Sequence, residues 1–471
     1  MNRVVMLAHA LLLCAACESS ENKQLTREEL LDPEACKNCH PNHYREWASS
    51  MHAYATDDPV FLAMNRRGQE ETAGTDAEIG DFCVNCHAPM AVRENAIDDF
   101  AELEDLPQHL KGVTCYFCHN VTSVDGDHNA MLSLANDTTM RGGIANPVQP
   151  DAHRAQYSEI HDGDSAKSSA VCGACHDIVT HAGVHLERTF EEYQDSLFAR
   201  PGLGFSTCQT CHMNEYRGIA ADDPESGVSQ RIVHEHMWPG VDVALTDFPD
   251  REAQRLAVEC DLANSAFIFS LDRGELPTDF KVVLETEAGH RQPSGAAQDR
   301  RMWLELIAYD AAGEVIFESG TIEDDESEVE AENDPDENRR AWMFRDRLVG
   351  ADGEEVHMFW EAVDFQSETL PFRTSLSPDH VRERTYRLPA EPARITTRMR
   401  MRPMGFDVLQ SLVDSGHLEE DVIAEMPTLP MYGGYGEWTP TGLFRRDRLP
   451  IDCPPHNGCL FDDRAAECGG R

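Results

Sequence analysis

Five short segments of the sequence repeat the pattern Cys-x-x-Cys-His, and no other feature constrains the chain as strongly. This pattern is the attachment signature of c-type haem. Two thiols one helical turn apart can bond to the vinyl groups of one porphyrin, and the next imidazole then binds the iron from the proximal side. Zinc sites also use Cys-x-x-Cys pairs, but they do not require a histidine after every second cysteine. The sequence therefore predicts five covalently bound haem c groups, attached through Cys36, Cys39, Cys83, Cys86, Cys115, Cys118, Cys172, Cys175, Cys208 and Cys211, with His40, His87, His119, His176 and His212 as proximal ligands.

The second axial position of each iron decides between two kinds of chemistry. A filled position favours electron transfer, whereas an open one allows a substrate to bind. The sequence has 21 histidines, which is enough to give every iron a second one. Sequence context favours His52, His153, His236 and His290 as distal ligands, and the weaker candidates are His43, His128, His161, His181, His185 and His234.

The five motifs occupy residues 36–212, which leaves too little chain per haem for separate protein cores. We expect the porphyrins to supply most of the apolar interior of a mainly helical and looped module. Apolar periodicity predicts one helix over residues 41–53 and another over residues 189–199, the second opened by a capping box of Thr189 and Glu192.

The residue pattern changes after about residue 260, beyond the last haem motif. Period-two alternation predicts strands at 280–286, 302–310, 314–318 and 394–402, and several short strands separated by turns are typical of a β-sandwich. The segment 323–337 holds ten carboxylates and is predicted to be a solvated loop. The expected fold is α+β, with a pentahaem module at 18–257, a β-sandwich at 258–402, and a helical, cysteine-containing extension at 403–471.

The N-terminus has the pattern of an export signal. Arg3 precedes an apolar run from Val4 to Leu13, which is too short to span a bilayer. The small residues before Cys17 are similar to a bacterial lipoprotein box, so we expect residues 1–17 to be the signal, Cys17 to carry a lipid, and the protein to lie in the periplasm or on the outer membrane. Cleavage without lipidation is the alternative.

Four cysteines remain in an oxidising compartment: Cys260, Cys453, Cys459 and Cys468. They allow two disulfides in three pairings, and a link from Cys260 to the C-terminal group would fasten the tail to the second half of the chain.

The charge of the chain is strongly acidic. Its 85 acidic and 40 basic residues give a formal net charge of −45. Such a body repels nucleic acid and anionic membrane surfaces, so contact with a membrane is expected only through the lipid on Cys17. We expect redox partners that are basic proteins or other cytochromes.

Several stretches resemble one family of multihaem cytochromes. They are CHPNHYREWASSMHA after the first motif, GVTCYFCHNVTSVDG at the third, AHRAQYSEIHDGDSAKSSAVCGACHD at the fourth and ERTFEEYQDSLFARPGLGFSTCQTCHM at the fifth, followed by His236-Met237-Trp238-Pro239-Gly240 and the loop 289–295. Over residues 34–402 the chain is similar to cytochrome c-554, the tetrahaem cytochrome c of nitrifiers, and to hydroxylamine oxidoreductase.

The resemblance implies closely stacked, mostly bis-histidine haems followed by an immunoglobulin-like β domain. It makes His52, His153, His236 and His290 the preferred distal ligands. The fifth stays open between His161, which we assign, and His128. The chain departs from the catalytic octahaem members because it has fewer motifs. It also lacks the Cys-x-x-Cys-Lys motif that pentahaem nitrite reductases typically use at the reactive haem.

These features support three hypotheses. The first is an electron carrier between redox partners, because enough histidines are available to fill the second axial position of every iron. The second is an oxidoreductase of small nitrogen or sulfur compounds with one open haem. In the third, the β domain is a docking or binding module for a partner, and it carries the haems with it.

Overall fold

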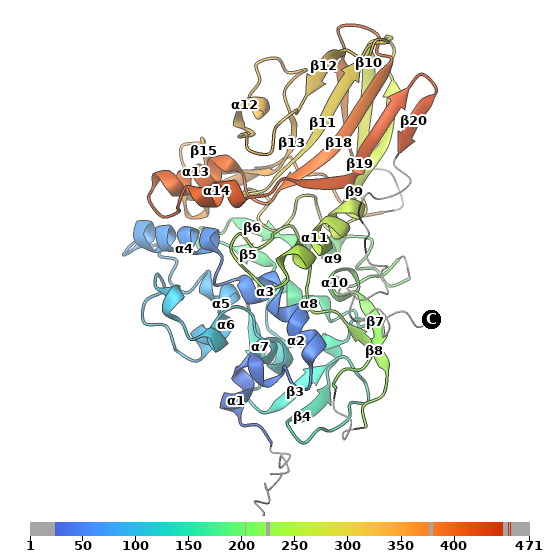
Figure 1. Ribbon diagram of the computed structural model, residues 1–471. Coiled ribbons are helices and arrows are strands. Elements are labelled where there is room, and N and C mark those ends of the chain that lie inside the picture. The colour runs from blue at the N-terminus through green and yellow to red at the C-terminus, as the bar shows by residue number, and fades with distance from the viewer. Residues whose placement is uncertain are drawn as a thin grey trace, which may run out of the picture.

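The computed structural model describes residues 24–202, 204–222, 227–375, 380–445, 451 and 453. Figure 1 shows two parts, one built of short helices and two-stranded ribbons and the other built of β-sheets. The α+β fold class is therefore confirmed. The expected signal segment 1–17, with Cys17, and the cysteines Cys459 and Cys468 lie outside the described residues. No helix within these ranges is long and apolar enough to cross a membrane.

The first part contains eleven α-helices among the described residues. They are α1 (Arg27–Leu31), α2 (Pro41–Ala48), α3 (Met51–Tyr54), α4 (Pro59–Thr72), α5 (Val84–His87), α6 (Pro89–Arg93), α7 (Cys115–Asn120), α8 (Ser169–Gly173), α9 (Thr189–Asp195), α10 (Cys208–His212) and α11 (Arg251–Ser265). Four two-stranded ribbons lie between them: β1 (Val121–Val124) with β2 (Leu132–Leu134), β3 (Thr139–Gly142) with β4 (Arg154–Tyr157), β5 (Asp177–Val179) with β6 (His185–Arg188), and β7 (Glu215–Gly218) with β8 (Arg231–His234).

Local sequence signals place helix starts at the haem-attachment motifs. Thr114 and Thr207 each precede a motif, and their side chains accept hydrogen bonds from the third residue of α7 and of α10. Such caps satisfy backbone N–H groups that have no partner inside the helix. Pro41 follows the first motif and begins α2, because proline suits the first position of a helix. Side-chain capping thus marks where the helices of the third and fifth motifs begin.

Two helix predictions need correction. The helix expected over 41–53 is two helices, because Ser49 ends α2 and the Ser50 side chain caps α3. The capping box expected at Thr189 is absent. The Asp177 carboxylate instead accepts from the backbone N–H groups of Phe190 and Glu191. The N-terminus of α9 is therefore capped by a side chain from a different segment.

The second part consists of three antiparallel sheets. The largest has the order β12 (Val315–Ser319), β11 (Arg301–Tyr309), β18 (Arg394–Arg402), β19 (Leu429–Thr439), β20 (Gly442–Arg445), with β13 (Trp342–Phe344) also paired to β11. The second has the order β17 (Val381–Arg387), β10 (Asp279–Thr286), β9 (Ala266–Arg273). The third has the order β15 (Glu355–Val356), β14 (Asp346–Gly350), β16 (Ala362–Ser367).

The first two sheets share one hydrophobic core, which includes Ile268, Phe280, Leu284, Leu304, Met399 and Met431. The strands expected at 280–286, 302–310, 314–318 and 394–402 are confirmed as β10, β11, β12 and β18. The boundary expected at residue 402 falls inside the largest sheet, because β19 pairs with β18. The immunoglobulin-like assignment of these sheets stays a prediction.

Helices and a disulfide join the two parts. Val60 and Ala63 of α4 pack with Leu409 and Leu412 of α13 (Phe406–Asp414), which is followed by α14 (Asp421–Glu425). The link predicted from Cys260 to the tail is confirmed as the disulfide Cys260–Cys453, with a Cα–Cα distance of 5.6 Å.

The acidic segment 323–337 is not a purely solvated loop, which corrects the prediction. It contains α12 (Val329–Glu332), and the side chains of Glu328 and Glu332 are buried. Glu328 pairs with Arg301 and Arg402, and Glu332 pairs with Arg345. Ion pairs with arginines of the sheets therefore stabilise the buried position of these two carboxylates.

Candidate haem-binding sites

Four of the five proximal histidines share one kind of hydrogen bond. In each of these four, Nδ1–H donates to a backbone carbonyl, and this fixes the tautomer that leaves Nε2 free to bind a metal. The pairs are His40 with Ala220 O at 2.6 Å, His87 with Ala55 O at 3.0 Å, His119 with Arg141 O, and His212 with Pro239 O at 2.9 Å.

Four of the proximal rings face a second histidine ring at nearly constant distance. The ring centres are 6.2 Å apart for His40 and His153, 6.2 Å for His176 and His52, 6.2 Å for His119 and His236, and 6.3 Å for His212 and His290. Two imidazoles on opposite sides of one metal, with metal–nitrogen bonds of about 2.0 Å, have their ring centres roughly 6 Å apart. The residues present therefore fit four bis-histidine haem irons.

The distal rings have the same tautomer signal as the proximal ones. Nδ1–H donates to a nearby carbonyl in three of the four, namely from His153 to Arg154 O, from His236 to His234 O and from His290 to Arg291 O, at 2.9–3.1 Å. Their Nε2 atoms are therefore available as ligands.

Burial favours the neutral form of five of these imidazoles. It lowers the pKa of His52 and His236 to about 3, and neighbouring histidines lower it further. For the same reason the pKa of His119, His176 and His290 falls to about 4. A neutral imidazole has the free lone pair that iron requires, so the sites are poised for ligation at physiological pH.

The two candidates for the fifth distal ligand are placed differently. His161 lies with its ring centre 6.1 Å from that of His119, but both of its nitrogens are engaged within the chain. Nε2 donates to Cys118 O at 2.8 Å, and Nδ1 lies 2.9 Å from Ser158 Oγ. The His128 ring pairs with the neighbouring Asp127 carboxylate.

His87 differs from the other proximal histidines. Its ring stacks on Phe61 of α4 with centres 3.8 Å apart, and in the part of the chain that the structure describes no histidine ring faces it at ligating distance. Among the described residues, the second motif therefore lacks the facing histidine ring that each of the other four motifs has.

Thiols of different motifs lie in hydrogen-bonding contact. The contacting pairs are Cys36 with Cys115, Cys86 with Cys175, and Cys172 with Cys208. These contacts raise the pKa of Cys86, Cys115 and Cys172 and lower that of their partners. Each of these thiols would bond to a porphyrin edge when haem is attached, so the contacting thiols would hold haems of different motifs near one another.

A glycine allows the close approach that places His52. Gly112 has φ +67°, and a Cβ there would lie 2.5 Å from the carbonyl oxygen of His52. The next residue, Val113, donates its backbone N–H to the same carbonyl and accepts from Trp47 Nε1, both at 2.8 Å. The segment before the third motif therefore holds the helix that carries His52.

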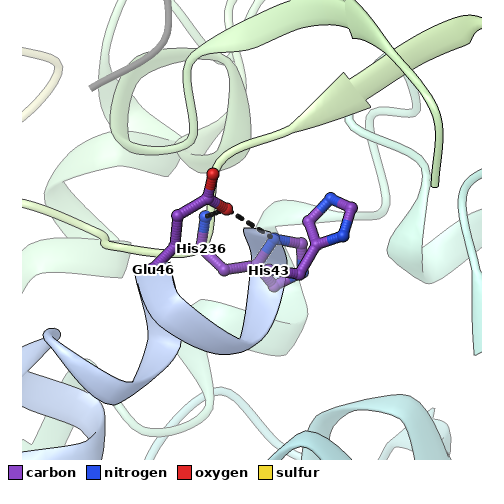
Figure 2. A group of neighbouring side chains, drawn as sticks. All are labelled: His43, Glu46 and His236. Atoms are coloured by element: carbon purple, nitrogen blue, oxygen red, sulfur yellow. Dashed lines mark hydrogen bonds and ion pairs between the residues drawn. The ribbon is translucent and has the colours of Figure 1, made fainter. Parts of the chain in front are cut away.

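Two residues beside the candidate distal ligands, Glu46 and Trp238, were not among the predicted site residues. Glu46 of α2 is fully buried, and its carboxylate accepts from the His236 backbone N–H at 3.0 Å (Figure 2). The His43 ring lies edge-on to His236 with centres 4.8 Å apart. Trp238 contacts two distal ligands, His52 and His236. The helical spacing of His43 and Glu46, three residues apart, was the available sequence signal.

Comparison with known proteins agrees with this geometry. Residues 35–120, which include three of the five motifs, match the family described as cytochrome c554 and c-prime. The fold is similar to that of the penta-heme cytochrome c552 from Thermochromatium tepidum, with a TM-score of 0.60 and 20% identity, covering 88% of this chain and 100% of that one. No curated protein matches the chain significantly.

Proposed function

We propose that the chain, which matches the cytochrome c554 family over residues 35–120, is a multihaem c-type cytochrome that carries electrons between redox partners through five haem groups. Bound haem supplies a one-electron iron couple at each motif. The observation that carries the proposal is the set of four histidine pairs at 6.2–6.3 Å. An iron closed by two imidazoles exchanges electrons without binding a substrate.

The thiol contacts define the route. The first motif contacts the third through Cys36 and Cys115, and the fourth contacts the fifth through Cys172 and Cys208. Cys118 of the third motif is close enough to Cys175 of the fourth for the two thiols to interact electrostatically. Electrons would thus pass along motifs one, three, four and five, and the second motif would join at the fourth.

Export and lipidation at Cys17 form part of the same proposal, supported by the apolar run that precedes this cysteine. A periplasmic or outer-membrane carrier with a net charge of −45 would dock basic proteins or other cytochromes. Its association with them should slow as ionic strength rises.

The proposal is tested on the protein produced in cells that mature c-type cytochromes. We expect an intact mass that includes five haem groups, and stepwise reduction of all five in a spectroscopic redox titration. Flash-initiated electron injection should then show transfer among the haems within one molecule. A mass with fewer haems, or reduction of isolated haems without exchange among them, would contradict the proposal.

The placement of His87 favours a second candidate, a haem-based oxidoreductase of small nitrogen or sulfur compounds acting at the second motif. We expect the reduced protein to bind one equivalent of carbon monoxide, because one iron lacks a facing histidine in the described chain. Two variants, His161→Ala and His128→Ala, should leave this stoichiometry unchanged. An extra equivalent in His161→Ala would instead show that His161 closes an iron, as the sequence analysis assigned.

A further inference from the structure

Trp238 lies between two of the distal histidines. Its ring is edge-on to His52, with centres 4.7 Å apart and planes at 74°, and edge-on to His236, with centres 5.2 Å apart and planes at 73°. Since His52 faces His176 and His236 faces His119, one indole contacts the ligand sets of two neighbouring irons. Edge-to-face contacts between aromatic rings are directional, so they favour one ring orientation over others.

The two contacted histidines are held in different ways. The ring of His236 donates from Nδ1 to His234 O, and its backbone N–H donates to Glu46 (Figure 2). The ring of His52 makes no hydrogen bond with any residue in the described ranges, and burial is the main influence on its pKa. Packing alone therefore sets the orientation of His52, and Trp238 is the aromatic ring nearest to it.

The backbone at Trp238 is in an uncommon conformation. Its φ is +49°, a region that side chains other than glycine rarely adopt. The neighbours fix this turn, because Met237 is buried against Ala253 and Ala257 of α11 and Pro239 O accepts from His212 Nδ1. A strained residue held by its surroundings is common at functional sites.

The angle between the two imidazole planes is larger for the pair that contains His52 than for the other three pairs. The planes of His52 and His176 cross at 69°, whereas those of the other three pairs lie within 15–28° of parallel. We propose that Trp238 is a positioning residue that keeps His52 turned across His176 and so makes the haem of the fourth motif electronically distinct from its neighbours. This inference rests on the proposed haem ligation.

The angle between the imidazole planes gives a direct spectroscopic readout. Near-parallel planes on ferric iron split its d orbitals strongly and give a rhombic electron paramagnetic resonance spectrum. Crossed planes leave the orbitals nearly degenerate and give a single large-g signal. The wild-type protein should therefore show rhombic signals from three haems and one large-g signal from the fourth motif.

The test compares Trp238→Leu, Trp238→Phe and Trp360→Leu in the full-length, haem-loaded protein. Trp360 is a matched tryptophan that packs on Phe359 and donates to Glu71, so it lies outside the ligand sets. We expect Trp238→Leu to lose the large-g signal in favour of a rhombic one and to shift the reduction potential of one haem. Trp238→Phe keeps an aromatic edge and should keep the signal, and Trp360→Leu should match the wild type.

The outcomes separate the inference from the proposed function. A large-g signal that persists in Trp238→Leu would overturn the positioning role and leave the bis-histidine assignment intact. A wild-type spectrum without low-spin signals would overturn both. If Trp238→Leu does not accumulate, Trp238→Met, which also lacks a ring, decides instead: loss of the large-g signal supports the role, and its persistence overturns it.

Discussion

Replacing Glu328 with alanine should lower the free energy of unfolding by about 3–5 kcal/mol, because it leaves the buried guanidinium of Arg402 without its ion-pair partner and leaves that of Arg301 with Asp407 alone. The side chains of Glu328, Arg301 and Arg402 are all 0% exposed. One carboxylate oxygen accepts from Arg402, and the other accepts from the Phe406 backbone N–H at 2.9 Å and lies 3.4 Å from Arg301 Nε. The carboxylate therefore ties β11, β18 and the start of α13 at one point.

The loss should appear as a lower urea midpoint for the β-sheet signal in circular dichroism. Glu330→Ala is the matched control, because Glu330 is an exposed carboxylate on the same short helix, and its replacement should change stability by less than about 0.5 kcal/mol. Glu328→Gln keeps an oxygen for the Phe406 N–H and should fall between the two. Equal midpoints for Glu328→Ala and Glu330→Ala would refute the role assigned to the buried carboxylate.

Sequence reasoning was strongest where covalent chemistry fixes spacing. The five proximal histidines follow from their motifs, because both cysteines and the imidazole must reach one porphyrin. Distal ligands carry no such local constraint. The fifth distal ligand was left open between His161 and His128, and in the structure both ring nitrogens of His161 are engaged, with Ser158 and Cys118. Which side chain faces which iron is decided by contacts between distant segments.

In the β part too, features set by local sequence were predicted, and features set by contacts between distant segments were not. Alternating residues predicted β10, β11 and β18, and burial does alternate along most of β10 and the first half of β18, whereas β11 is buried on both faces. The strands β19 and β20 were not predicted. Glycine and proline interrupt the alternation of apolar and polar residues in β19, and the helices α13 and α14 separate both strands in sequence from the rest of the sheet. The acidic segment was predicted to be solvated because the sequence around it offers many carboxylates and few cations. The arginines that pair with Glu328, Arg301 and Arg402, lie in strands that are distant in sequence.

His290→Ala should have the largest effect on the haem sites, because His290 comes from the β part and faces His212 of the haem-binding part. It lies in the connection between β10 and β11, and its ring centre is 6.3 Å from that of His212. Its neighbour Arg291 donates its backbone N–H to Glu192 at 3.0 Å, so the loop is docked independently of any iron. A single ligand bond would thus add to an existing contact between the two parts.

We expect His290→Ala to turn one low-spin iron high-spin and to raise carbon monoxide binding by the reduced protein by one equivalent, since the loop stays docked while the ligand is lost. Added imidazole should restore the low-spin spectrum by entering the vacated position, a rescue that a merely structural histidine would not show. His357→Ala, a second histidine of the β part outside the ring pairs, should leave the spectrum as it is. An unchanged spectrum in His290→Ala would instead mean that the β part covers the fifth haem without binding its iron, and the ring geometry would then be a packing contact.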